Sequence, residues 1–272
     1  MGFKIILSDI DGTFLTSDKK VTDLTAYAAR KIIDNGLKFV LVSARMPEAI
    51  FPITDSIGLP RIPLICYSGA YVLTESEEIL HDKKMPADDT KNIIAAMIDN
   101  WKDISINYYS GRNWFVQKID SRIQREIDIT QAHAEIADFN ELLNQNIIPH
   151  KIMVICDPTT CEDMERVLNE MFNNLNIVRS APHLLEIMDK NVSKAVGIEI
   201  LLKHYNFSAD EAIAFGDNYN DIQMLEYIPN SVAMNNAPDD IKNIARFVTD
   251  SNNDSGIYSY LAKIGLIEYA KN

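Results

Sequence analysis

The sequence predicts an α/β fold in which a smaller α+β domain is inserted into a parallel-sheet core. Strand and helix signals alternate in the first quarter of the chain, the pattern changes character after His81, and the alternation returns from Val192. Such alternation is typical of parallel sheets with right-handed crossovers. We therefore expect a discontinuous core, residues 1–83 and 188–272, around an inserted domain of residues 84–187.

The first part of the core follows from short apolar runs and one amphipathic segment. Residues 3–8 and 37–42 are continuous apolar runs of strand length. Residues 22–35 place apolar side chains on one helical face and end before a glycine, a common helix stop. A helix starting near Pro47 and a strand over 64–67 complete a β-α-β-α-β unit.

The inserted domain mixes amphipathic helices with alternating strands, and Ser110-Gly111 forms a hairpin turn between two of the strands. The elements expected there are helices over 89–101 and 161–172 and strands over 104–109, 113–118, 151–156, 176–179 and 183–188.

The core resumes with a helix that Ser193 can cap. The elements expected in this part are a helix to about Tyr205, a strand over 211–215, a helix over 221–227, and short strands over 231–234 and 246–249.

Composition narrows the class of partner. The chain has 272 residues, 47% of them hydrophobic, a net charge of −13 and a sequence pI near 4.8. This charge argues against nucleic acid or an anionic membrane as a partner, because both would be repelled. A local basic pocket could still bind a small phosphorylated molecule. We expect the protein to be a monomer or a dimer.

The cysteines and the start of the chain bear on location. The three cysteines form no C-x-x-C pair, which predicts reduced structural thiols in a cytoplasmic protein. The first apolar run is short and ends in acids, unlike a signal peptide. No apolar stretch reaches membrane-spanning length.

Two carboxylates, Asp9 and Asp11, follow the first apolar run and precede Gly12-Thr13. A buried strand cannot carry two unpaired carboxylates into a core, so they lie at its exit or hold a cation. Mg²⁺ prefers oxygen ligands, and ligands of parallel sheets bind at the carboxyl ends of strands. The alternative is that Asp11-Gly12 is an ordinary turn.

Three further segments carry polar groups at strand ends or helix starts. Ser43 follows the second strand. Lys194 lies in the first turn of a helix, against the helix dipole, which indicates an anion in front of it. The alternative is that Lys194 is a solvated surface lysine. Residues 216–221 (GDNYND) leave a strand and enter a helix, where Asn and Asp could also serve only as turn and capping residues.

In this order the four segments resemble the four motifs of the haloacid dehalogenase superfamily, with Asp9–Thr13 similar to the first motif. The insertion resembles the C2B cap of the Cof-type sugar-phosphatase branch, and the core would be Rossmann-like. Supporting stretches are 185–187 and 232–237, and the resemblance covers essentially the whole chain.

The resemblance implies a Mg²⁺-dependent phosphatase of small phosphorylated metabolites, with sugar phosphates foremost. Asp9 would form an aspartyl-phosphate, and Asp11 would act as acid and base, for which a closed cap would raise its pKa by desolvation. The implied metal ligands are Asp9, the main-chain carbonyl of Asp11 and Asp217, with Asp221 supporting them. The implied phosphate-binding groups are Ser43, Lys194, Asn220 and the amides near Ile10 and Ala44.

We expect the inserted cap to select the substrate, and a separate set of residues to contact it. The candidates are Arg45, Arg112, Arg179, His183 and Glu186. Compared with the branch, Ala44 and Ala195 replace glycines and Ser68 replaces an asparagine, which puts the phosphate loop and one substrate contact in doubt. Alternative functions are a phosphomutase-like phosphotransferase and a non-catalytic ligand-binding module on the same scaffold.

Overall fold

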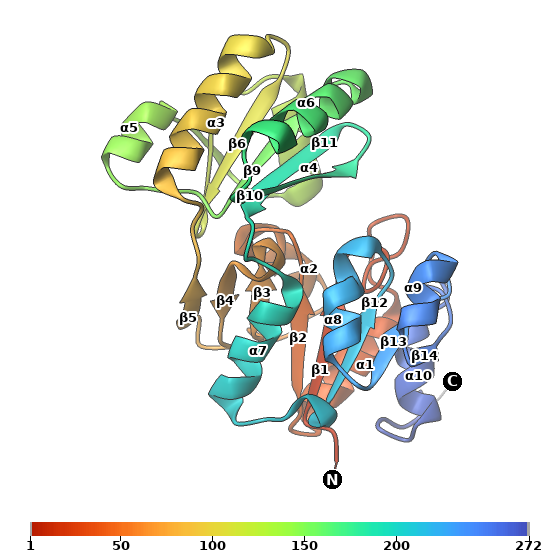
Figure 1. The fold of residues 1–272 in the computed structure, drawn as a ribbon. Helices are drawn as coiled ribbons and strands as arrows, with labels where there is room; N and C mark the ends of the chain where they lie inside the picture. Colours follow the sequence, from red (N-terminus) through yellow and green to blue (C-terminus); the bar gives the residue numbers. More distant parts are fainter. Residues whose placement is uncertain (1, 271–272) are drawn as a thin grey trace. The chain divides into compact units, whose positions relative to one another are not determined.

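The computed structural model describes residues 2–270, which divide into two compact units. The first unit contains the chain up to Arg45, Ile53–His81 and the chain from Ser193 onward. The second contains Met46–Pro52 and Asp82–Val192. Each unit has its own sheet and helices (Figure 1), and the predicted α/β class is confirmed.

The first unit is built on an eight-stranded sheet of order β14-β13-β12-β1-β2-β3-β4-β5. The pairs from β14 to β3 are parallel, as predicted. The strands are β1 (Ile5–Asp9), β2 (Lys38–Val42), β3 (Leu64–Cys66), β4 (Tyr71–Leu73), β5 (Ile79–Asp82), β12 (Ala212–Gly216), β13 (Ser231–Ala233) and β14 (Phe247–Val248).

The parallel arrangement does not extend across the whole sheet. β4 pairs antiparallel with β3, because only the short turn η2 (Tyr67–Gly69) joins them, and so short a connection cannot cross over. The sequence interpretation missed β4 and β5.

Helices accompany the sheet of the first unit. Thr22 caps α1 and Ser193 caps α7, each accepting a main-chain amide, so both predicted helix starts are confirmed. The helices are α1 (Asp23–Asp34), α2 (Phe51–Ser56), α7 (Lys194–Tyr205), α8 (Ile222–Tyr227), α9 (Asp239–Ile244) and α10 (Gly256–Lys263). Within residues 2–270, no helix combines the length and the apolar character that crossing a bilayer requires.

The second unit is a six-stranded sheet of order β10-β11-β9-β6-β7-β8, antiparallel except between β7 and β8. The strands are β6 (Ser105–Ser110), β7 (Asn113–Val116), β8 (Ala134–Ile136), β9 (Lys151–Ile155), β10 (Leu175–Ala181) and β11 (Leu184–Asp189). The helices are α3 (Ala87–Asn100), α4 (Ser121–Thr130), α5 (Phe139–Asn144) and α6 (Pro158–Met171).

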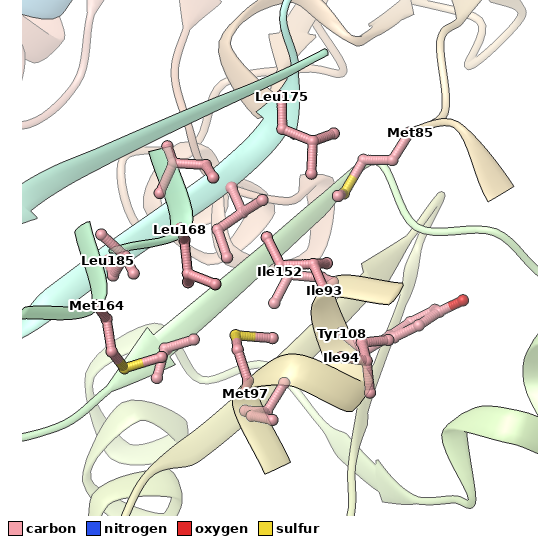
Figure 2. Close-up of a cluster of buried hydrophobic side chains, with 14 of the residues drawn as sticks. Met85, Ile93, Ile94, Met97, Tyr108, Ile152, Met164, Leu168, Leu175 and Leu185 are labelled. Carbon is pink, nitrogen blue, oxygen red and sulfur yellow. The ribbon is translucent and has the colours of Figure 1, made fainter. Parts of the chain in front are cut away.

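A separate hydrophobic core supports the second unit. Met97 of α3 and Leu168 of α6 pack against alternate residues of the sheet, such as Ile152 and Leu185 (Figure 2). The alternation is that of a sheet with one face toward helices. The roles of catalytic core and cap for the two units stay predictions. The boundary expected at residue 188 falls within β11, which continues to Asp189.

The prediction of reduced thiols is wrong for two of the three cysteines. Cys156 and Cys161 form a disulfide with a Cα–Cα distance of 5.9 Å, while Cys66 is free and buried. The chain turns from β9 directly into α6 across this pair, which brings residues five apart into bonding range. Cysteine spacing therefore gives no support for a reducing compartment.

Candidate active site

The acidic segments of the first unit meet at one edge of its sheet. Asp9 is the last residue of β1, and Asp217 follows β12 directly. These strands are parallel neighbours, with Ser8 opposite Phe215, so their carboxyl ends lie together. Asp9 is only 5% exposed, at the end of a strand that is otherwise buried.

Lys194 joins this cluster from the first turn of α7. Its ammonium donates to Asp9 Oδ1 and, at 2.5 Å, to Asp221 Oδ1. The side chain is 1% exposed. Lys194 is therefore a buried partner of two carboxylates, and the alternative of a solvated surface lysine is wrong.

The backbone at Gly69 lies close to the backbone at Ser193, and this contact places Lys194 beside the carboxylates. Gly69, at the end of η2, has a φ of +106°, and a Cβ built there would lie 2.0 Å from the carbonyl oxygen of Ser193. Only glycine permits this contact, which brings the start of α7 against the end of β3. Ser193 holds the helix start by accepting the amide of Val196 at 3.3 Å.

Asp221 has two tasks in the 216–221 segment. Its Oδ2 accepts the amides of Asp217 at 2.9 Å and Asn218 at 3.0 Å, which folds the turn. Its Oδ1 accepts the Lys194 ammonium. The turn-forming interpretation of this segment thus describes one oxygen of Asp221, while the other belongs to the acidic cluster.

The electrostatics of the cluster follow from its composition. Three buried carboxylates face one ammonium, so two negative charges are uncompensated when all are ionised. Burial, then the Asp221 charge, raises the pKa of Asp9 well above its usual range despite Lys194. Burial also raises the pKa of Asp217 to about 6, opposed by a hydrogen bond from Thr13. Burial alone would lower the pKa of Lys194, but the two carboxylates raise it.

A divalent cation fits this arrangement. Asp9, Asp217 and Asp221 each offer an oxygen, and these three atoms lie within 4.8 Å of one another. Oxygen ligands suit Mg²⁺, and its charge would offset the excess of the cluster. Both oxygens of Asp221 already accept hydrogen bonds, from Lys194 and from the Asp217 amide. The Asp221 carboxylate can therefore orient these neighbours of the ion while it faces the ion itself.

Asp11, two residues from Asp9, has a different environment. Arg45 donates to both of its oxygens, at 2.8 Å and 2.7 Å, and Lys19 adds a bond of 2.9 Å. Burial would raise the pKa of Asp11, but Arg45 and then Lys19 outweigh it and hold this pKa well below its usual range. In this structure the pKa of Asp11 is therefore lowered, because the two cations favour the carboxylate, and the rise expected on cap closure stays a prediction.

The predicted phosphate-binding groups lie around the same sheet edge. Ser43 follows β2, is 3% exposed, and accepts the amide of Arg45 at 3.2 Å. Ile10 is buried between Asp9 and Asp11. Ala44 is half-buried and lies outside the left-handed backbone region, so its Cβ brings no backbone strain. Asn220 is exposed on η4 (Tyr219–Asp221), beside Asp221.

Ser68 occupies unusual backbone. Its φ is +54°, within η2, in the left-handed region that asparagine tolerates better than serine. Serine in place of asparagine at position 68 therefore makes this backbone conformation less favourable, besides any loss of a side-chain contact.

The residues proposed for substrate choice in the second unit do not form one cluster. Arg112, at the β6–β7 turn, donates to Glu48 at 2.6 Å within the same unit. Arg179 on β10 bonds Glu165 of α6 at 2.7 Å, which favours a structural role. His183 is exposed in the β10–β11 turn.

Glu186 differs from the other three because it is buried. It is 8% exposed on β11 and lies 3.4 Å from the Lys151 ammonium. The Lys151 ammonium also lies 5.3 Å from the centre of the Tyr109 ring. The sequence interpretation did not find this buried cation beside Glu186, because an isolated lysine at the start of a strand carries no signal.

Three residues that contact the acidic groups received no role from the sequence. Lys19 binds Asp11 from the segment before α1. Thr13 donates to Asp217 Oδ1 at 2.7 Å, and Asn236 donates to the carbonyl of Gly12 at 2.9 Å. The only signal was that Thr13 and Asn236 belong to stretches that resemble family motifs.

Comparisons with known proteins agree with this geometry. The family of haloacid dehalogenase-like hydrolases matches residues 6–261. A Haemophilus influenzae protein named "Putative phosphatase" is 32% identical over 258 residues, covering 94% of this chain and 96% of that protein.

Solved structures share the fold over the full length. A Thermotoga maritima protein aligns with a TM-score of 0.86 at 24% identity, covering 99% of this chain and 98% of the other. A structure described as a sugar phosphatase of HAD subclass IIB aligns with a TM-score of 0.82 at 24% identity, covering 97% and 100%. These two likenesses concern the fold.

Proposed function

The chain belongs to the haloacid dehalogenase-like hydrolases and is a phosphatase of that family, and from this premise we propose a mechanism and a substrate class. We propose that the protein is a Mg²⁺-dependent enzyme that hydrolyses small phosphorylated metabolites through an aspartyl-phosphate on Asp9. One observation carries the proposal. Asp9 lies in a buried acidic cluster with Asp217, Asp221 and Lys194, two residues from a second carboxylate with a separate hydrogen-bond environment.

The first half-reaction transfers the phosphoryl group to the protein. An oxygen of Asp9 attacks phosphorus in line, the new O–P bond forms, and the ester O–P bond breaks. Asp11 gives a proton to the leaving oxygen. Since Arg45 and Lys19 hold Asp11 as a carboxylate, Asp11 must leave these partners and take up a proton from solvent before it can act as an acid.

The second half-reaction releases phosphate. Water attacks phosphorus, Asp11 takes its proton, and the bond to Asp9 breaks, which restores the Asp9 carboxylate. Ser43, Lys194, Asn220 and the amides near Ile10 and Ala44 are proposed to bind the phosphoryl oxygens. Charge spreads over these oxygens in the transition state, so fixed donors lower the barrier.

Asp9, the main-chain carbonyl of Asp11, and Asp217 are proposed to hold Mg²⁺, with Asp221 supporting them. When bound, the ion neutralises the cluster and reduces repulsion between the Asp9 carboxylate and an incoming phosphate. The excess negative charge of the buried cluster supports this proposal.

Sugar phosphates are the proposed substrate class. The likeness of fold to a structure described as a sugar phosphatase supports testing them first. The second unit is proposed to act as the cap that reads the leaving group. Its candidate residues are Arg112, Arg179, His183 and Glu186, and Arg45 of the first unit is a further candidate. The protein is proposed to work in the cytoplasm without nucleic acid or membrane partners.

The test is phosphate release from a panel of phosphorylated sugars, nucleotides and an aryl phosphate, with Mg²⁺ and with chelator. We expect Mg²⁺-dependent release, highest kcat/KM for a sugar phosphate, and no activity of Asp9→Asn. Phosphoryl transfer to another sugar hydroxyl without free phosphate would indicate a phosphomutase instead. Absence of turnover on every compound would favour a ligand-binding module.

A further inference from the structure

Two neutral side chains from distant parts of the chain hold the Asp217 carboxylate. Thr13, which is 1% exposed, donates its hydroxyl to Asp217 Oδ1 at 2.7 Å. Asn236 directs its amide to Asp217 Oδ2 at 3.4 Å and to the Gly12 carbonyl at 2.9 Å. Asn236 thus connects the turn after β1 to the carboxylate after β12.

The carboxylate also packs against the backbone of this turn. Gly12 has a φ of +90°, and a Cβ built there would lie 2.2 Å from Asp217 Oδ2. The carboxylate therefore occupies the space that any other side chain at position 12 would need. Movement of the Gly12 carbonyl, which Asn236 holds, would shift the surface on which Asp217 lies.

The orientation of the Asn236 amide is itself determined by its surroundings. Its Oδ1 accepts the main-chain amide of Asn252 at 3.0 Å, so its NH₂ group must point toward Gly12 and Asp217. The Asn252 side chain, 5% exposed, donates to the Leu15 carbonyl at 2.8 Å. The loop after β14 thereby anchors Asn236 and the segment after the first turn together.

The chemistry of these donors suits a cation ligand. Asp9 and Asp221 share the Lys194 ammonium, and Asp11 accepts from cationic Arg45 and Lys19. The donors to Asp217 are a hydroxyl and an amide, which orient a carboxylate without neutralising it. Groups that hydrogen-bond to a metal-binding carboxylate in this way orient it and increase affinity.

We propose that Asn236 and Thr13 are positioning residues that orient the Asp217 carboxylate for a divalent cation. The inference rests on the proposed function, since it concerns the same metal site. It assigns a task to the chain segment around Asn236, which contains none of the groups proposed to bind the phosphoryl oxygens.

The experiment measures Mg²⁺ binding directly, by isothermal titration calorimetry on the full chain without substrate. Asn236→Ala should weaken Mg²⁺ binding by about tenfold. Asn235→Ala is the matched control, because Asn235 is the exposed neighbour and donates to the Asp250 carbonyl through its main-chain amide, which the substitution keeps. We expect Asn235→Ala to bind Mg²⁺ like the parent.

Thr13 allows an isosteric comparison. Thr13→Val removes the hydroxyl at nearly constant volume and should weaken Mg²⁺ binding by about tenfold. Thr13→Ser keeps the hydroxyl and should bind Mg²⁺ like the parent. Thermal unfolding without metal should be similar for Ser and parent. A role in packing alone would reverse this pattern, with Ser the weaker variant and Val like the parent.

The outcomes separate the inference from the proposed function. If the parent does not bind Mg²⁺, the metal part of the proposed function fails and this inference fails with it. If the parent binds and both Asn236→Ala and Thr13→Val bind equally well, only the positioning roles are overturned. A loss in those two variants, with Thr13→Ser and Asn235→Ala normal, supports the inference.

Discussion

Asp9 and Asp11 are two residues apart, yet their environments are opposite. Asp9 is 5% exposed and shares one ammonium with a second carboxylate, in a cluster with more negative than positive charge. The Asp11 side chain is 38% exposed and accepts from two cations. Burial and like charge raise the pKa of Asp9, whereas Arg45 and Lys19 lower that of Asp11.

The difference teaches that the surrounding charges, and not the residue type, distinguish the two carboxylates. The Asp9 side has one ammonium for three carboxylates, and a divalent cation would offset the excess negative charge. The Asp11 side already has positive charge and must give some of it up before its carboxyl can carry a proton. The following substitutions alter one side at a time.

Asp9→Asn should have the largest effect. The amide cannot attack phosphorus, so turnover should fall by about 10⁴-fold or more on every substrate. The fold should persist, because Asn has nearly the shape of Asp and removes a buried negative charge. Burial of that charge is unfavourable, as the raised pKa of Asp9 indicates. The measurements are steady-state phosphate release and thermal unfolding. Retention of activity within about tenfold of the parent would remove Asp9 from its proposed role.

Lys194→Met should destabilise the metal-free protein by about 3 kcal/mol at pH 7, because two buried carboxylates lose their ammonium. Mg²⁺ should restore part of this stability. Denaturant unfolding with and without Mg²⁺ measures both effects. Lys203→Met, in the last turn of the same helix, is the control. Equal stability of Lys194→Met and parent without metal would contradict the charge description of the cluster.

Asp217→Asn should change the pH dependence of stability. The pKa of Asp217 is about 6, above the roughly 3.9 of an unfolded aspartate. Its ionisation therefore destabilises the metal-free protein as pH rises from about 4 to 6, by about 2 kcal/mol. The substitution should flatten the unfolding free energy over this window, and exposed Asp240→Asn should not. An unchanged slope in Asp217→Asn would show that Asp217 ionises normally.

Arg45→Ala should have the smallest effect, on the Asp11 side. The folded pKa of Asp11 is lowered, so its stabilisation is complete above about pH 4, the unfolded value, and is lost as pH falls toward the folded pKa. The melting temperatures of parent and variant should therefore converge below about pH 4. Arg30→Ala, whose guanidinium binds the Ile57 carbonyl, should show a constant difference. A pH-independent difference for Arg45→Ala would contradict the pairing with Asp11.

The parallel sheet and its polar edge could be predicted from sequence because both are local patterns. Continuous apolar runs such as 37–42 indicate buried strands, and parallel strands bring their carboxyl ends to one edge. The hairpin around Gly111 and the cap of α7 at Ser193 were predicted on the same local basis. The four segments at the sheet edge, in family order, also led to the correct family.

Contacts between separate elements, even elements close in sequence, could not be predicted in this way. The disulfide of Cys156 with Cys161, the antiparallel β4 and the pairing of Arg179 with Glu165 depend on how elements turn and pack. No periodicity of a single segment records them, so the thiol prediction failed.

The sequence by itself determined the class of the fold, the order of its motifs and the carboxylates available for chemistry, because hydrophobic periodicity and strand ends are local properties of a chain. Only the tertiary structure decided the charge state that each carboxylate favours. The low pKa of Asp11 comes from Arg45, 34 residues away, and the orientation of Asp217 from Thr13, 204 residues away. Electrostatic shifts depend on distance in space and on burial, which exist only once the chain has folded.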